Sequence, residues 1–337
     1  MNATMKDIAR ETGLGLATIS KYLNGGNVRD ANRAAIDAAI KKLDYHINEY
    51  ARGLKSNHSR TIGIVIPELS NVFVTEIITH LEEPLRAKGY SAIICDCHNS
   101  PKLECEAVAF LLRKRVDGII NMPVCQDGRH LKAAGEAGLP IVLLDRTIPG
   151  KPELADCVVI DNENATRQAT RYLLERGHRA IGILLGPDEI YTSIHRYNGY
   201  ADALRDFGTA VAPSLVAHSD YTVKGGHESF LQLMQNNPSM TALLVTNYEM
   251  TLGAILAANE CSVQIPQRLS FIGFDNALLA KVTQPQLTIV TQPLEEIGRQ
   301  AARIMLERMR GEGGGARVTV SLSASLACGA SVAALPG

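Results

Sequence analysis

The chain has 337 residues, of which 46% are hydrophobic and 20% charged, and its mean hydropathy is 0.00. This length allows two or three domains, and the composition excludes a disordered, collagen-like or membrane-embedded chain. The net charge of −1 is uneven: residues 1–60 carry ten Lys and Arg against six Asp and Glu, whereas the remainder carries 24 against 29. A basic first segment favours contact of that segment with a polyanion.

No stretch reaches 18 uninterrupted apolar residues, and the N-terminal MNATMKDIARETG lacks the apolar core of a secretory signal. We therefore expect no membrane span and a cytoplasmic location. Seven cysteines, an odd number, are scattered along the chain. Without an oxidising compartment we expect them to be free thiols.

The basic segment predicts three short helices. The first begins at the capping pattern Thr4-Met5-Lys6-Asp7 and ends at Gly13, and the second covers residues 16–23. Two short helices joined by a glycine-containing turn predict a helix-turn-helix, whose second helix enters the DNA major groove. A third helix is expected over residues 30–43. Its predicted apolar stripe consists of Ala34, Ala35, Ala38, Ala39 and Leu43. A three-helix protein-binding module is the alternative.

Residues 46–59, HINEYARGLKSNHS, have the composition of a linker. A helix this short with Gly53 inside it is not stable alone, because nucleation is costly and glycine adds about 1 kcal/mol. Any helix here is therefore expected to fold only on contact with a binding partner.

From Thr61 onward, apolar strands alternate with amphipathic helices. The strands are TIGIVIP, SAIICD, VDGIIN, PIVLLD, CVVID, AIGILLG, ALLVTN and LSFIGFD, and helices are expected at 74–88, 102–115, 163–177, 193–207 and 249–260. Near-continuous apolar strands indicate parallel sheets covered on both faces. More than 200 residues of this pattern predict an α/β fold with two doubly wound lobes and a cleft between them.

Four segments carry a family resemblance: MKDIARETGLGLATISKYLNG, NRAAIDAAIKKLDY, NEYARGLKS and TIGIVIPELSN. In this order they resemble the LacI/GalR family of transcription regulators, and the likeness continues along essentially the whole chain. The resemblance implies a helix-turn-helix domain at 1–45, a hinge at 46–60 and an effector-binding and dimerisation domain of periplasmic-binding-protein type at 61–337. Lobe 1 would cover about 61–159 and 292–321, and lobe 2 about 160–291 and 322–337, with crossings near Val159, Thr291 and Leu322.

The resemblance also implies a DNA-binding set. Its members are Thr4, Leu16, Ala17, Thr18, Ser20, Lys21, Asn24, Ala51, Arg52, Leu54 and Lys55. Lys21 can donate to guanine, while Leu16 and Ala17 can touch thymine methyl groups. Gly15 stands where the family usually has Ser, and Lys21 stands where Arg is usual. We therefore expect DNA affinity to depend more on phosphate and hinge contacts than in relatives with Arg. Leu54 would wedge into a central base step of the minor groove, with Arg52 and Lys55 on phosphates.

Ligands of open α/β sheets collect at the carboxyl ends of strands, where this chain places polar and aromatic residues. With two residues added by family position, Arg196 and Tyr221, the candidate effector site is Asn71, Phe73, Asp145, Arg146, Arg196, Tyr221, Asn247, Asp275 and Gln292. Planar faces combined with amide and charged groups suit a sugar ring. For any single residue, capping the following helix is the alternative.

No catalytic set is visible: there is no P-loop, no G-x-S-x-G and no arguable Ser/His/Asp group. Cys95, Cys97, His98 and Cys105 lack the spacing of a metal site, so neither a metal nor a cofactor is expected. We therefore expect no enzymatic activity.

The sequence thus predicts a homodimeric DNA-binding regulator, a repressor, acting on a near-palindromic double-stranded operator and controlled by a small sugar-like effector. Two other classes share such a body. A pure solute-binding protein would carry a secretory signal and no basic segment, and a sugar-metabolising enzyme would show turnover.

Overall fold

The computed structural model describes residues 3–23, 25–45, 58–275, 277–312 and 314–335. The chain divides into two compact units, Met1–Ser59 and Arg60–Gly337. We call the first unit the head. All seven cysteines are free thiols. Within the described ranges, no helix is both long enough and apolar enough to cross a bilayer.

The head contains α1 (Met5–Thr12), α2 (Leu16–Leu23) and α3 (Asp30–Leu43), at the positions predicted from sequence. At the start of α1, the Thr4 backbone N–H and hydroxyl both donate to the Asp7 carboxylate, at 2.9 and 2.7 Å. Gly13 ends the helix with φ of 69°, a left-handed conformation that glycine adopts without strain.

The predicted apolar stripe of α3 is wrong at three of its five positions. Ala34, Ala35 and Ala38 are exposed, whereas Ile36 and Ala39 are buried. Ile36 joins Ile8 and Ile19 in the core of the head. An isoleucine buries far more apolar area than an alanine, so the bulky residue decides which face of the helix turns inward.

The second unit, Arg60–Gly337, contains two six-stranded sheets within the described residues. The first has the order β11-β5-β4-β3-β1-β2 and consists of β1 (Thr61–Ile66), β2 (Ser91–Asp96), β3 (Gly118–Asn121), β4 (Ile141–Leu144), β5 (Asp156–Ile160) and β11 (Thr319–Leu322). The second has the order β12-β10-β9-β8-β6-β7 and consists of β6 (Ile181–Leu185), β7 (Val216–His218), β8 (Ala242–Val245), β9 (Ser270–Phe274), β10 (Thr288–Thr291) and β12 (Ser325–Ala327). All pairings are parallel except that of β12 with β10, which is antiparallel, contrary to the purely parallel expectation.

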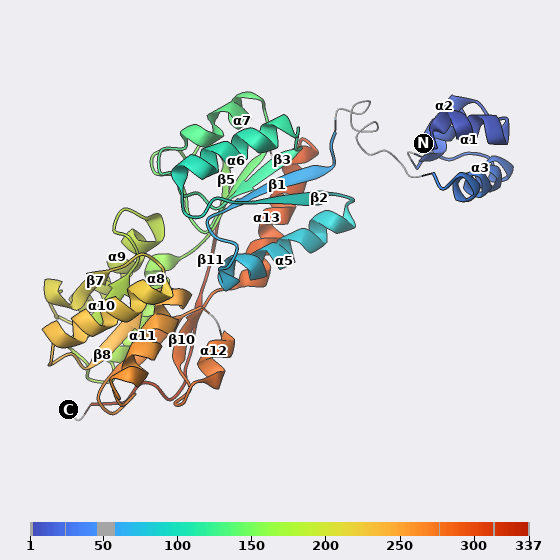
Figure 1. Cartoon of the computed structure of the whole chain (residues 1–337). Helices are drawn as coiled ribbons and strands as arrows, with labels where there is room; N and C mark the ends of the chain where they lie inside the picture. Colours follow the sequence, from blue (N-terminus) through green and yellow to red (C-terminus); the bar gives the residue numbers. More distant parts are fainter. Residues whose placement is uncertain (1–2, 24, 46–57, 276, 313, 336–337) are drawn as a thin grey trace. The chain divides into compact units, whose positions relative to one another are not determined.

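Each sheet is covered by helices on both faces, as predicted for a doubly wound fold (Figure 1). Around the first sheet lie α5 (Val72–Ala87) and α13 (Leu294–Met309) on one face, and α6 (Pro101–Arg113) and α7 (Lys132–Glu136) on the other. Around the second lie α8 (Asn162–Leu174) and α9 (Tyr191–Asp206) on one face, and α10 (Val223–Asn236) and α11 (Tyr248–Glu260) on the other. We call the first sheet with its helices lobe 1 and the second lobe 2.

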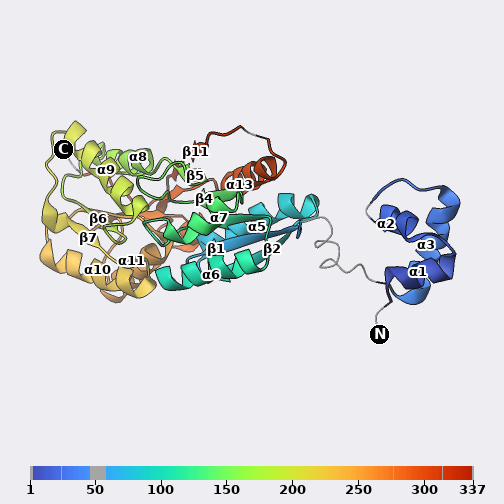
Figure 2. The same cartoon turned by 90° about the horizontal axis from the view of Figure 1, so that it is seen from above.

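Alternating strand residues explain this layering. In β1, Ile62 and Ile64 pack with α5 and α13, whereas Val65 packs with α6 and α7. Successive side chains of a strand point to opposite faces, so an all-apolar strand serves two cores at once. The chain passes between the sheets three times, between β5 and β6, between β10 and β11, and between β11 and β12, as can be followed by colour in Figure 2.

Candidate functional site

A cavity of about 510 Å³ lies between the two lobes. All nine effector-site candidates line this inter-lobe cavity: Asn71, Phe73, Asp145, Arg146, Arg196, Tyr221, Asn247, Asp275 and Gln292. They come from segments that follow strands of both sheets and from α5 and α9. The carboxyl ends of parallel strands meet at one edge of each sheet, and this brings together residues far apart in the sequence.

Two carboxylates enter the cavity from matching backbone positions. Asp145 follows β4 and Asp275 follows β9, with φ of 66° and 67°. The Asp145 N–H donates to the Val158 carbonyl at 3.0 Å, and the Asp275 N–H to the Val290 carbonyl at 2.7 Å. A left-handed backbone conformation costs free energy for a residue with a side chain. It persists here because the hydrogen bond to the neighbouring strand holds the backbone, and this fixes the position of each carboxylate.

Arg196 on α9 is the most firmly held cation of the cavity wall. It is 4% exposed, and its Nε donates to Asn162 Oδ1 at 2.7 Å while Nη1 donates to the Thr246 carbonyl. Its guanidinium lies 4.4 Å from the centre of the Phe274 ring. Hydrogen bonds and ring stacking leave the guanidinium with one orientation, so it presents a preorganised donor.

Asp275 is buried beside Gln292. Gln292 Nε2 donates to Asp275 Oδ1 at 2.6 Å, and Gln292 Oε1 is buried without a hydrogen-bond partner among the described residues. Burial raises the pKa of Asp275 to about 7, against the opposing effects of Arg196 and Gln292. An acceptor left without a donor in a buried place is expected to bind a ligand donor or an ordered water.

Asn71 and Asn247 both cap helices. Asn71 Oδ1 accepts from the Val74 N–H at 3.2 Å, and Asn247 Oδ1 accepts from the Met250 N–H at 3.0 Å. The capping role that sequence reasoning held as the alternative is therefore present at both positions, and it leaves the amide nitrogens to face other groups.

Among the described residues, Phe73, Tyr221 and Tyr248 are the aromatic residues of the cavity lining. The Tyr221 hydroxyl lies 2.9 Å from Thr192 Oγ1 and 2.7 Å from Ser193 Oγ. A Cβ at Gly186 would overlap the Tyr221 ring, so the glycine lets the ring lie against the backbone after β6. Gly186 was not predicted, although its place directly after a strand was the available signal.

Sequence reasoning also missed Glu249, which lines the cavity in the first turn of α11. Its Oε2 accepts from Asn247 Nδ2 at 2.8 Å, and burial raises the pKa of its carboxyl. Arg146, by contrast, pairs with its neighbour, since its Nη2 lies 3.1 Å from Asp145 Oδ2. A ligand acceptor would therefore have to compete with Asp145 for Arg146.

In the head, the candidates on α2 divide by exposure. Leu16, Ala17 and Lys21 are exposed, and Thr18 and Ser20 are half-buried around the core residue Ile19. Thr4 is exposed at the start of α1. The other DNA-binding candidates, Asn24, Ala51, Arg52, Leu54 and Lys55, lie outside the described residues.

Both units match known families. Residues 4–48 match bacterial regulatory proteins of the lacI family, and residues 59–325 match periplasmic binding proteins and sugar binding domain of LacI family. The chain is 33% identical over 314 residues to catabolite control protein A of Priestia megaterium, which covers 93% of this chain and 94% of that protein. It is 33% identical over 323 residues to the HTH-type transcriptional repressor CytR of Escherichia coli (strain K12). That match covers 94% of this chain and 93% of CytR.

Solved structures agree in fold. The transcriptional regulator CelR–cellobiose complex is 27% identical with a TM-score of 0.76, covering 98% of this chain and 99% of that one. The lac repressor dimer bound to operator and the anti-inducer ONPF is 23% identical with a TM-score of 0.87. That match covers 99% of this chain and 100% of the lac repressor chain. The arrangement of a helix-turn-helix unit ahead of two α/β lobes is thus shared over the full length.

Proposed function

Because the chain belongs to the LacI family of bacterial regulatory proteins, it is a DNA-binding transcriptional regulator, and we propose that a neutral sugar-like effector in the inter-lobe cavity controls it. The observation that carries the proposal is the convergence of nine polar and aromatic residues from both lobes on one cavity of about 510 Å³. Cavities of roughly 300 to 1,000 Å³ hold small-molecule ligands.

The charges of the cavity support a neutral ligand rich in hydroxyl donors. Asp275, Glu249 and the orphan Gln292 Oε1 all accept hydrogen bonds, whereas Arg146 is already paired with Asp145. The ionised forms of these carboxyl groups would repel a phosphate group, and Arg196 is, among the described residues, the cavity-lining cation left to offset its charge. Sugar hydroxyl groups would donate to the same atoms, and a related regulator structure is a complex with cellobiose.

The DNA-binding surface we propose is α2, with Leu16, Ala17 and Lys21 facing the bases of a near-palindromic operator. Thr18 and Ser20 are placed to contact either the DNA backbone or a base, and Thr4 belongs to the same DNA-binding set. The exposure of Thr4, Leu16, Ala17 and Lys21 supports this assignment. The roles of Leu54 as minor-groove wedge, of Ala51, Arg52 and Lys55 beside it in the sequence, and of Asn24 as a DNA contact remain predictions. A homodimer would present two heads to two half-sites, as a two-fold operator requires.

The cavity and the head are coupled in this proposal through the lobes. A ligand that touches both lobes changes their relative free energy, and a coupling between effector and operator binding must be reciprocal. We propose repression in the cytoplasm, where the chromosome lies, and binding of the sugar without turnover. The relatives reported above are transcriptional regulators.

The test uses the full chain and an operator selected from random inverted repeats. Thermal unfolding is followed with neutral mono- and disaccharides and with their phosphates, and operator binding by fluorescence anisotropy with each stabilising compound. A neutral saccharide should raise the unfolding temperature by mass action and change operator affinity. Stabilisation by phosphates alone would reject the neutral-ligand assignment, and conversion of the sugar to product would reject the non-enzymatic one.

A further inference from the structure

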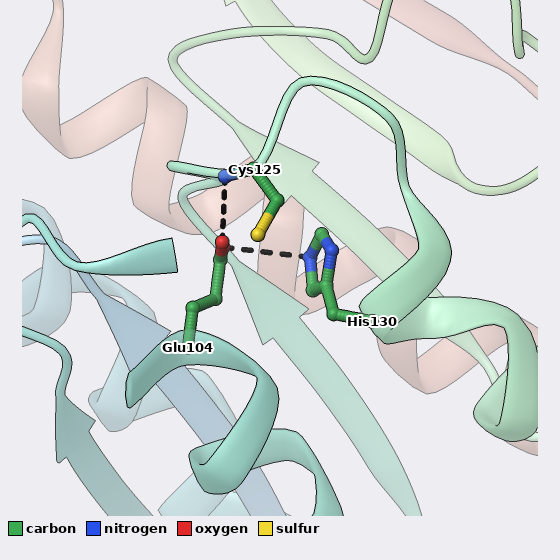
Figure 3. A group of neighbouring side chains, drawn as sticks. All are labelled: Glu104, Cys125 and His130. Carbon is green, nitrogen blue, oxygen red and sulfur yellow. Dashed lines mark hydrogen bonds and ion pairs between the residues drawn. The ribbon is translucent and has the colours of Figure 1, made fainter. Parts of the chain in front are cut away.

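Three buried side chains with metal-binding atoms meet in lobe 1, and none of them is among the nine effector-site candidates. Glu104 lies in the first turn of α6, Cys125 follows β3, and His130 lies in the short helix η1 (Arg129–Leu131). Figure 3 shows the three side chains pointing toward one another. One carboxylate oxygen, the sulfur and one imidazole nitrogen all lie within 4.8 Å of each other.

The Glu104 carboxylate is buried without a full positive charge beside it. It is 0% exposed, and it accepts from the N–H groups of Val124 at 3.0 Å and Cys125 at 2.6 Å and from Asn121 Nδ2 at 3.0 Å. Among the described residues no Lys or Arg pairs with it, and the nearest ionisable ring, that of His130, is itself buried with its Nε2 3.4 Å from Glu104 Oε1. A buried charge that only neutral dipoles compensate is costly, and a cation at this point would relieve the cost.

The hydrogen bonding of the cluster is also incomplete. His130 Nδ1 and Asn121 Oδ1 are buried without a partner among the described residues. His130 Nε2 lies 3.0 Å from Asn121 Nδ2 and 3.4 Å from Glu104 Oε1. Two ligands bound to Zn²⁺ at 2.0 to 2.2 Å in tetrahedral geometry are separated by about 3.4 Å, so the Glu104 and His130 atoms already have the spacing of ligands.

A second cavity, of about 780 Å³, gives access to the cluster. We call it the side cavity; Cys105 and Cys125 line it, and it shares Asn99, Arg146 and Tyr221 with the inter-lobe cavity. Of the three cluster residues, Cys125 is the one that lines the side cavity, so an ion entering there would meet the cluster at Cys125.

We propose that Glu104, Cys125 and His130 bind a divalent transition metal of the Zn²⁺ type, with a fourth position open to the side cavity. One carboxylate, one thiolate and one neutral imidazole form a donor set that favours Zn²⁺ over Mg²⁺ or Ca²⁺. The Cys125 thiol releases its proton to solvent as the metal binds, and the ion with carboxylate and thiolate is then neutral overall. The N–H groups of Val124 and Cys125, which donate to the Glu104 carboxylate, hold that carboxylate in place.

Sequence reasoning expected no metal because it looked for closely spaced ligands. Glu104 and Cys125 are 21 positions apart, and neither belongs to a C-x-x-C pattern. Only the packing of α6 against the segment that follows β3 brings them together.

The test titrates Co²⁺, as a spectroscopic substitute for Zn²⁺, into the untagged, reduced, full-length chain. We expect one equivalent to give a thiolate-to-cobalt charge-transfer band that Zn²⁺ removes and Mg²⁺ does not. Cys125→Ser should lose the band and weaken Zn²⁺ binding by more than about tenfold, whereas the matched control Cys261→Ser, at an exposed thiol, should keep both.

Absence of the band in the unaltered chain overturns the proposal, and so does its survival in Cys125→Ser. If Cys125→Ser fails to fold, as circular dichroism would show, His130→Gln decides instead. That variant is expected to weaken Zn²⁺ binding measured against a competing chelator, and an unchanged affinity would overturn the site.

Discussion

Asp145 of lobe 1 and Asp275 of lobe 2 share a backbone geometry but differ in their surroundings. Both follow a strand with φ near 66°, and both donate their N–H to the neighbouring strand. Asp145 faces the adjacent Arg146, whose side chain is 13% exposed. Asp275 is held by Gln292 and lies near Arg196, which is fixed by Asn162, Thr246 and Phe274. The same fold position thus carries a local ion pair in one lobe and a buried network in the other.

This difference assigns the two lobes different parts in effector binding. The polar groups of lobe 2 have lost their freedom before the ligand arrives, so a ligand gains their hydrogen bonds at little entropic cost. The Arg146–Asp145 pair of lobe 1 joins neighbouring residues nearer to solvent and can rearrange. We expect lobe 2 to supply most of the affinity, and lobe 1 to respond to occupancy.

The largest expected effect is that of Arg196→Ala. Removing this cation takes the positive charge away from Asp275 and the hydrogen-bond donor away from the Asn162 oxygen. Breaking such a buried network costs about 2 to 5 kcal/mol, so effector affinity should fall at least about 30-fold. Calorimetry measures the affinity, and anisotropy the operator response, which should disappear while operator binding remains. Arg146→Ala is the matched control and should lose less. Equal losses in the two variants would contradict the division between the lobes.

The second effect is a dependence of stability on pH. Asp275 has a pKa of about 7 in the folded chain and about 3.9 when unfolded, so between pH 4 and 7 the native state binds more protons. The free energy of unfolding should therefore decrease as pH rises through this range. Asp275→Asn should flatten the slope and stabilise the chain at pH 8 by about 1 to 4 kcal/mol, as measured by urea unfolding. Asp145→Asn should keep most of the slope, because the charge of Asp145 contributes less than burial to the raised pKa of Asp275. Loss of the whole slope in Asp145→Asn would contradict its assignment to Asp275.

The fold was predictable because its determinants are local. Apolar strands such as residues 61–66, alternating with amphipathic helices, specify doubly wound lobes without knowledge of any contact. The prediction failed where the choice depended on packing. In α3 the core selected Ile36 over the alanines beside it, and β12 reversed direction because it enters the second sheet directly from β11.

The inter-lobe cavity was predictable for a similar reason. Residues after parallel strands share an edge, which a sequence reader can use, and Arg196 and Tyr221 came from family position. Gly186, Glu249 and the Glu104 cluster were missed because their roles depend on a neighbour that only the tertiary structure supplies. For Gly186 that neighbour is the Tyr221 ring, and for Glu249 it is the buried wall of lobe 2.

The third effect tests how rigid lobe 2 is around Tyr221. Gly186→Ala places a methyl group where the ring lies, so the ring must move, and effector affinity should fall by about 1 to 3 kcal/mol. Gly135→Ala in α7 of lobe 1, which has open space at its Cβ, is the matched control and should bind normally. Calorimetry on both variants gives the comparison. Normal binding by Gly186→Ala would show that this wall adapts and is not preorganised.

The smallest effect separates capping from ligand binding at Asn71 and Asn247, which occupy helix starts in lobe 1 and lobe 2. Loss of either cap should cost about 1 kcal/mol of stability, seen as similar shifts in urea unfolding. Asn247 also donates to Glu249, so Asn247→Ala should weaken effector binding several-fold and by more than Asn71→Ala does. If Asn71→Ala weakens binding as much as Asn247→Ala, its amide contacts the ligand directly, and lobe 1 is then as much a binding surface as lobe 2.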